Sequence, residues 1–178
     1  NLREGGRLLK EAGFAIKDGK LTDPRGKPVS VEIVSATDSM ERLILFYKPA
    51  LERLGVTVSV RTIDSAQYEQ RLRTFDFDLT AKVWPESLSP GNEQREFWGS
   101  QSAKEPGSEN ICGIENPAVD ALIGRIIFAK DRAELVAATK ALDRVLLWNF
   151  YVVPHYTAGG WNFARWDRFS HPEPLPKY

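Results

Sequence analysis

The feature that most constrains the fold is an alternation of strand and helix signatures along the first half of the chain. Apolar residues at every second position predict strands at 29–36, 56–63 and 75–84, and apolar residues at helical spacing predict helices at 38–54 and 64–75. Strands separated by helices are joined by right-handed crossovers and tend to run parallel. The order therefore predicts an α/β fold with a mixed or parallel sheet flanked by helices.

The segments on either side of this alternation follow other patterns. A helix is predicted at 3–12, followed by a hairpin at 15–21 that turns at Asp18-Gly19. Pro, Gly, Ser and Asn are frequent across 85–113, which predicts a long loop with one short helix at 92–98. Loops of this length inside a compact domain are often functional.

The last third of the chain predicts a helical hairpin followed by an aromatic segment. Asn116 and Asp131 have the character of helix caps, and the connection between the two helices is short, so the helices should be antiparallel. Strands are predicted at 151–156 and 161–166. The aromatic residues gathered here are interpreted as core beneath the hairpin; the alternative is an apolar wall facing a ligand or a missing domain.

Composition excludes several classes of protein. Lys and Arg together number 24, as do Asp and Glu, so the net charge is zero and no basic excess points to nucleic acid. Cys112 is the single cysteine, which leaves no internal disulfide and no paired zinc ligands. The two histidines, His155 and His171, lack the spacing of a metal-binding pair. We expect neither a metal nor another cofactor.

Catalytic patterns are weak. No nucleophile elbow or phosphate-binding glycine loop is present, and a Cys112–His155 dyad has no support from spacing. Asp76 and Asp78 could form a carboxylate pair, but at alternate positions of a strand they are interpreted as a solvated face. The sequence therefore predicts a protein that is not an enzyme.

The best candidate site is the loop that follows the third predicted strand. In α/β sheets ligands bind at the carboxyl ends of strands. Glu86 supplies a carboxylate there, and Ser87 and Ser89 supply hydroxyl groups. These groups suit a ligand that has both charge and peptide-like hydrogen-bonding groups; the alternative is a solvated turn.

Several segments, taken in order, resemble a known family. They are RLLKEAGF at 7–14, LERLGVTV at 51–58, FDFDL at 75–79 before a tryptophan and a proline loop, SEN at 108–110, and R-x-x-L from 132. The string resembles the carboxyl-terminal lobe of the extracytoplasmic oligopeptide-binding proteins of ABC transporters, solute-binding protein family 5. The segments SLSPGNEQ at 87–94 and WDRF at 166–169 are most similar to its YejA-like subgroup.

The resemblance implies one lobe of a type II periplasmic-binding-protein clamshell, in which two lobes enclose the ligand. Residues 1–178 would form a single α/β lobe of a larger periplasmic protein. The amino-terminal lobe would be absent, in keeping with a chain that begins at Asn1 rather than Met. The partners implied are an oligopeptide ligand, the permease subunits of the transporter and the missing lobe.

The resemblance also suggests which residues bind the ligand. Peptide binders of this family place an acidic residue three positions after the strand's tryptophan to pair with the ligand's ammonium group; here that position is Ser87, and Glu86 is the nearest carboxylate. The residues expected to contact the ligand are Trp84, Glu86, Ser87, Ser89, Asn92, Arg95, Asn110 and Tyr156. Trp84 would act as an aromatic wall, and Asn110 as an amide that binds backbone.

Two other functions stay open at this level. The chain could be a docking module that meets another protein through its aromatic carboxyl-terminal segment. It could also be a small hydrolase that uses the 84–113 loop, although no base–nucleophile pair supports that hypothesis.

Overall fold

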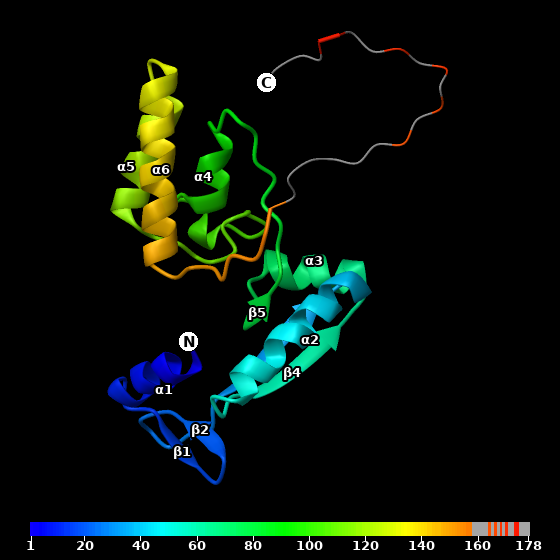
Figure 1. The fold of residues 1–178 in the computed structure, drawn as a ribbon, viewed down its shortest axis with the longest axis vertical. Coiled ribbons are helices and arrows are strands. Elements are labelled where there is room, and N and C mark those ends of the chain that lie inside the picture. Colours follow the sequence, from blue (N-terminus) through cyan, green and yellow to red (C-terminus); the bar gives the residue numbers. More distant parts are fainter. Residues whose placement is uncertain (158–163, 165, 167, 169, 171–172, 175–178) are drawn as a thin grey trace. The chain divides into compact units, whose positions relative to one another are not determined.

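The computed structural model describes residues 1–157, 164, 166, 168, 170 and 173–174 (Figure 1). The chain divides into two compact units. The sheet unit comprises Asn1–Trp84 with Glu105–Ser108, and the helical unit comprises Pro85–Lys104 with Glu109–Tyr178. All strands found in the described residues belong to the sheet unit.

A parallel sheet forms the centre of the sheet unit. Its strands are β3 (Ser30–Ser35), β4 (Thr57–Thr62) and β5 (Leu79–Thr80), in the order β4-β3-β5. Ser30 pairs with Thr57 and Ile33 with Leu79, and both pairings are parallel. The predicted α/β class and the crossover connections are confirmed.

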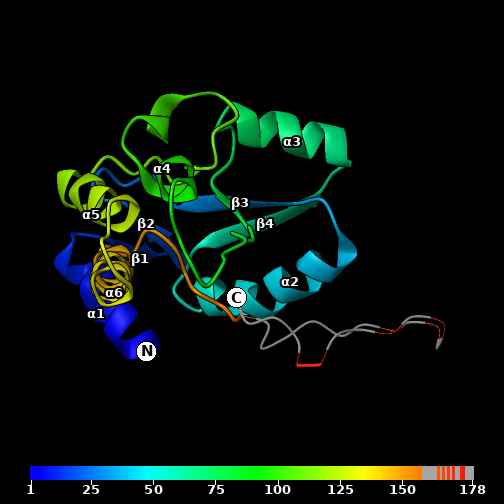
Figure 2. The same cartoon turned by 90° about the horizontal axis from the view of Figure 1, so that it is seen from above.

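Two helices cover opposite faces of this sheet, α2 (Asp38–Glu52) and α3 (Ser65–Arg73) (Figure 2). Ile44 of α2 packs on Ile33 and Val58 to form a small buried cluster. The amino-terminal cap of α2 is Thr37, whose hydroxyl accepts a hydrogen bond from Met40 N. Pro49 does not end the helix, which continues to Glu52.

The third strand is much shorter than the predicted 75–84. Phe75, at φ 56°, lies in the left-handed region directly after α3 and so cannot begin a strand. The Asp78 carboxylate accepts a hydrogen bond from Glu32 N at 2.8 Å. In a longer strand, a backbone carbonyl would have accepted this bond. A side chain therefore holds the residues just before β5 against β3. The Asp78 carboxylate thus binds the backbone of β3, which does not support a catalytic pair with Asp76.

The amino-terminal part of the sheet unit is built as predicted. Helix α1 (Leu2–Glu11) precedes a hairpin of β1 (Ala15–Lys17) and β2 (Lys20–Thr22). Asp18 and Gly19 both have positive φ, 49° and 75°, as the tightest hairpin turns require.

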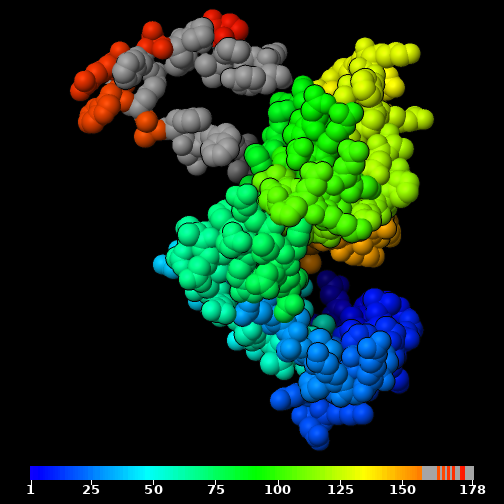
Figure 3. All heavy atoms as spheres, turned by 180° about the vertical axis from the view of Figure 1, so that it is seen from behind, coloured from blue at the N-terminus to red at the C-terminus, as the bar shows by residue number. Residues whose placement is uncertain are grey.

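The helical unit contains α4 (Glu93–Trp98), a 3₁₀ turn (Ser102–Lys104), α5 (Pro117–Ile127) and α6 (Arg132–Trp148). Asn116 and Asp131 cap α5 and α6 with their side chains, as predicted. In Figure 1 the two long helices lie side by side, and in Figure 3 the green residues from α4 onward abut the yellow residues of the hairpin without a gap. The core of this unit is apolar: Phe97, Trp98, Ala103, Ile111, Ile114, Val119, Ile123, Ile126, Ala138 and Leu142.

The predictions for the aromatic segment are only partly testable. Residues 151–157 form no strand, which corrects the strand predicted at 151–156; most of the strand predicted at 161–166 lies outside the described residues. Trp148, Phe150 and Tyr156 are 76%, 81% and 78% exposed, so the interpretation of these three as core is wrong. Trp148 is the last residue of α6, and Phe150 and Tyr156 follow that helix.

Candidate functional site

The Glu86 carboxylate is the chemically distinctive group of the 85–92 loop. Gln94, a buried residue of α4, donates its amide Nε2 to both carboxylate oxygens of Glu86 at 2.9 Å. Among the described residues, no Lys or Arg side chain forms an ion pair with this carboxylate. Partial burial raises the pKa of Glu86; the Gln94 amide opposes this effect and the negative charge of Glu93 adds to it.

A second carboxylate, that of Glu93, has a different environment. Burial opposes its ionisation, but hydrogen bonds from the backbone of Gly91, from its own N–H and from Gln94 outweigh this and lower its pKa. The Gly91 N–H donates to Glu93 Oε1 at 2.6 Å. Glu93 thus holds the end of the loop through the Gly91 N–H, whereas the charge of the Glu86 carboxylate is not balanced by a cation among the described residues.

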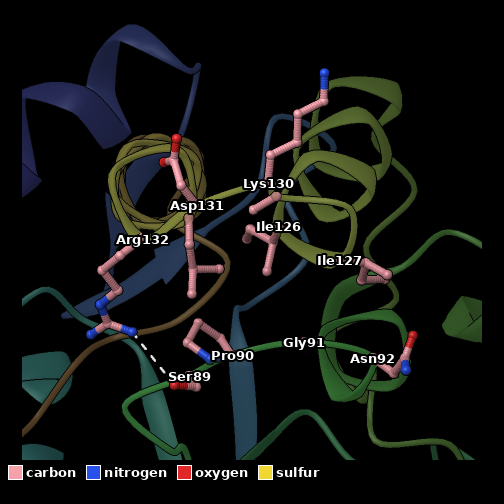
Figure 4. A pocket seen from close by; sticks show the side chains of 11 residues that line it. Ser89, Pro90, Gly91, Asn92, Ile126, Ile127, Lys130, Asp131 and Arg132 are labelled. Atoms are coloured by element: carbon pink, nitrogen blue, oxygen red, sulfur yellow. Dashed lines mark hydrogen bonds between the residues drawn. The ribbon is translucent and has the colours of Figure 1, made fainter.

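The middle of the loop is fastened to α6. Arg132, the first residue of that helix, donates from Nη1 to the carbonyl of Leu88 at 2.6 Å, and its distance to Ser89 Oγ is 3.5 Å (Figure 4). Within the loop, Ser89 N donates to Ser87 Oγ at 3.0 Å. The Ser87 hydroxyl thus bonds to the backbone of the loop, and the Ser89 hydroxyl lies near the start of α6.

Two open pockets lie beside the hydrogen bond between Arg132 and Leu88, both within the helical unit. One has a volume of about 410 Å³ and is lined by Glu86, Ser87 and Leu88 of the loop, by Gln94 and Trp98 of α4, and by one face of α6. The other, of about 380 Å³, is lined by Ser89 and Asn92 together with the ends of α5 and α6 (Figure 4). Arg132 lines both pockets.

The structure places the other predicted site residues elsewhere. Asn110 has no exposed surface, and its carboxamide bonds to the backbone of Gly99 and Ile114. Arg95 is exposed on α4, and Tyr156 is exposed after α6. Trp84 is half-buried at the end of the sheet unit. The structure thus brings together Glu86 with Ser87, and Ser89 with Asn92, at the pockets that Arg132 lines.

Two residues of this site, Gln94 and Arg132, were not among those predicted. No local pattern connects Gln94 to a carboxylate eight residues earlier. Arg132 gave a signal that could have been used, because a cation in the first turn of a helix is disfavoured by the helix dipole and so needs a partner elsewhere.

Two further findings concern the described part of the chain. None of its groups of His, Cys, Asp and Glu side chains is arranged to hold a metal ion. Within the same residues, no helix has both the length and the apolar character needed to cross a membrane.

The chain is similar to proteins of one family. Residues 1–106 match the model of the bacterial extracellular solute-binding proteins, family 5 Middle. The chain is 51% identical over its whole length to the uncharacterized protein y4wM of Sinorhizobium fredii, and 46% identical to the probable peptide-binding protein YejA of Agrobacterium fabrum. It spans only 27% and 29% of these two relatives.

Solved structures share its fold. A periplasmic oligopeptide-binding protein of Thermotoga maritima with bound mannohexaose matches 86% of this chain with a TM-score of 0.74 and 23% identity. The oligopeptide-binding protein AppA of Bacillus subtilis, in complex with a nonapeptide, matches 85% with a TM-score of 0.72 and 21% identity. The chain covers 30% of each of these proteins.

Proposed function

Because the chain belongs to the bacterial extracellular solute-binding proteins of family 5, we propose that it is part of the substrate-binding component of an ABC transporter. In this proposal the complete protein captures oligopeptides in the periplasm and delivers them to a membrane permease. It binds its ligand without chemical change and is not an enzyme. The sequence segments that resemble the carboxyl-terminal lobe of this family's proteins point to the same function.

We propose that residues 1–178 form one lobe and that the remainder of the polypeptide supplies the other. Relatives more than three times as long support this, because this chain spans only 27% and 29% of two of them. A ligand enclosed between two lobes would lose most of its contact with water, which strengthens each polar contact it makes.

The single observation that carries the peptide proposal is the environment of Glu86. Glu86 is an exposed residue, but the protein around its carboxylate raises its pKa by desolvation, and the carboxylate has no cationic partner among the described residues. The free ammonium group of a peptide would supply the missing charge through a charge-assisted hydrogen bond. A neutral oligosaccharide, such as the one bound to the Thermotoga protein, could supply only hydroxyl groups.

The remaining predicted residues take subsidiary roles in this proposal. Ser87 and Ser89 offer hydroxyl groups to the peptide backbone; Asn92 and Arg95 offer further polar contacts, and Trp84 and Tyr156 offer aromatic surfaces. Asn110 acts indirectly, by holding the backbone of the helical unit in place.

The test is calorimetric titration of the full-length polypeptide that carries this chain. The ligands are a mixture of short peptides, the same peptides with acetylated amino termini, and a neutral oligosaccharide. We expect binding of the free peptides and a loss of at least about tenfold on acetylation, since a charge-assisted bond is removed. Tighter binding of the oligosaccharide than of any peptide would contradict the proposal.

A pair of variants connects this test to the site. Glu86→Gln keeps the shape of the side chain and removes its charge, so it should weaken the free peptides but not the acetylated ones. Glu96→Gln is the matched control, because Glu96 is an exposed residue of the neighbouring helix α4. Equal affinity of both variants for free peptides would exclude Glu86 as the ammonium partner.

A docking function remains a second candidate because of one observation. The described aromatic residues Trp148, Phe150 and Tyr156 are all more than three-quarters exposed, which is unusual for large apolar side chains. Replacing Trp148 and Phe150, which have no role in the peptide proposal, by Ser should abolish binding to a protein partner and leave peptide affinity unchanged. The reverse result would assign the segment to ligand binding.

A further inference from the structure

We propose that Arg132 is the positioning residue of the ligand-binding loop: it holds the segment that carries Glu86, Ser87 and Ser89 in the shape that binds the ligand. The inference rests on the proposed function, and it names a residue that contacts the loop rather than the ligand. Its basis is the hydrogen bond from the Arg132 guanidinium to the carbonyl of Leu88, 44 residues earlier in the chain.

The loop needs such a fastening because apolar packing does not hold it at this point. Leu88 is 67% exposed, so the side chain at the middle of the loop contributes little buried surface. Its carbonyl, in contrast, lies 2.6 Å from Arg132 Nη1, a short hydrogen bond from a charged donor. Such bonds are about twice as strong as those between neutral groups.

The helix that carries Arg132 gives no other reason for a cation at this position. Helix α6 is already capped: Glu134 N donates to Asp131 Oδ1 at 2.8 Å, and Lys130 N donates to Glu134 Oε2 at 3.0 Å. A positive charge in the first turn of a helix is disfavoured by the dipole. Figure 4 shows the Arg132 side chain directed toward Ser89, whereas that of Lys130 extends the other way.

Arg132 is one of three side chains that hold the loop by hydrogen bonds. Gln94 holds the Glu86 side chain, Arg132 holds the Leu88 carbonyl, and Glu93 holds the Gly91 N–H. Gln94 and Glu93 both belong to α4, so Arg132 is the member of this set that ties the loop to α6. Removing it should free Leu88 and Ser89 while Glu86 keeps its amide partner.

The experiment uses three variants of the full-length polypeptide. Arg132→Met removes the charge and all donors but keeps an unbranched side chain, and Arg132→Lys keeps one charged donor group. Arg144→Met is the matched control, because Arg144 is an exposed arginine of the same helix with no hydrogen bond or ion pair in the described structure. Each is measured by calorimetry with the free-amino peptide mixture, by hydrogen exchange of the amides of residues 86–89 and 91, and by thermal unfolding.

We expect Arg132→Met to weaken peptide binding about tenfold and to speed amide exchange at Leu88 and Ser89, because a charged hydrogen bond is lost. Arg132→Lys should recover affinity to within about threefold of the parent, and Arg144→Met should match the parent. If Arg132→Met only lowers the unfolding temperature, with affinity and loop exchange unchanged when folded, the positioning role is wrong.

The two proposals fail in different ways. If the parent protein binds no peptide, the proposed function fails, while loop exchange in Arg132→Met still shows whether this arginine holds the loop. If the parent binds peptide and Arg132→Met binds it equally well, the function stands and the positioning role fails. Should Arg132→Met not fold, Arg132→Gln takes its place, since it removes the charge but keeps a neutral donor. Weaker peptide binding together with faster exchange at Ser89 in that variant would support the role, and unchanged affinity and exchange would overturn it.

Discussion

The side chain of Asn110 satisfies both backbone polar groups of Ile114. Its Nδ2 donates to the Ile114 carbonyl at 3.0 Å, and its Oδ1 accepts from the Ile114 N–H at 2.9 Å. The same Nδ2 also donates to the carbonyl of Gly99 at 2.9 Å. Ile114 is only 1% exposed, so water cannot replace these bonds, and one carboxamide joins the chain after α4 to the chain before α5.

The first prediction follows from this arrangement. Asn110→Ala should lower the free energy of unfolding of the helical unit by about 2–4 kcal/mol, because three buried hydrogen bonds are lost and their partners stay unsatisfied. Asn149→Ala is the control, since Asn149 is exposed and, among the described residues, its side chain bonds only to the Val145 carbonyl. Urea unfolding measures both; a change of less than about 0.5 kcal/mol for Asn110→Ala would show that water enters this site.

A second prediction concerns the turn before β4. Gly55 has φ +84°, and a Cβ placed there would lie 2.8 Å from both the Leu21 N and Ile16 Cδ1. Its carbonyl accepts a hydrogen bond from Leu21 N at 2.7 Å, which ties the β1–β2 hairpin to this turn. Gly55→Ala should cost more than the about 1–2 kcal/mol of an unfavourable φ alone.

Gly19 provides the comparison for that substitution. It also has positive φ, +75°, but nothing lies within 4 Å of its Cβ position. Gly19→Ala therefore measures the backbone cost without the clash. Equal losses of stability in the two variants, measured by urea unfolding, would mean that the hairpin moves away from Gly55 without cost.

The pH dependence of stability should report on Glu86. Its folded pKa is raised, mainly by burial, so between the unfolded and folded pKa values the folded state holds more protons than the unfolded state. Stability therefore falls as pH rises through this window. Glu86→Gln should unfold at a higher temperature than the parent at pH 7, and the difference should shrink below the unfolded pKa. A gain that persists unchanged at low pH would exclude this explanation.

A fourth prediction tests what holds the segment before β5. Arg71 Nη1 lies 2.7 Å from Glu32 Oε1, and Arg71 Nε donates to the Asp76 carbonyl at 2.7 Å. Arg71→Met should destabilise the sheet unit measurably, because bonds to a charged group are lost. Arg61→Met is the control: Arg61 is 3.9 Å from Glu32 and its side chain is 60% exposed, so its loss should cost less than about 0.5 kcal/mol in urea unfolding.

The clamshell proposal makes a prediction about the chain in isolation. Residues 1–178 alone should bind peptides with a dissociation constant at least about a hundredfold weaker than the full-length polypeptide, because half of the enclosing contacts are absent. Calorimetry on both proteins measures this. Equal affinities would mean that the complete site lies within this chain.

Local chemistry explains why most helices and strands were predictable. The alternation of apolar residues at 29–33 and along β4, and the caps Asp64, Asn116 and Asp131, are short-range signals whose physical cause lies within a few residues. The left-handed turn at Asp18 and Gly19 is of the same kind. The sequence by itself thus determined the α/β class, the parallel crossovers and the helical hairpin.

Tertiary structure decided the rest, because it depends on partners far apart in the chain. The alternation at 75–84 predicted a long strand, but Arg71 and Glu32 engage the Asp76 and Asp78 region and leave a strand of two residues. The same holds for the site: the burial that raises the pKa of Glu86, the internal use of Asn110, and the hydrogen bond from Arg132 to Leu88 all arise from packing between separate segments. A pattern of residue types cannot specify such contacts, since each depends on where the folded backbone places the second group.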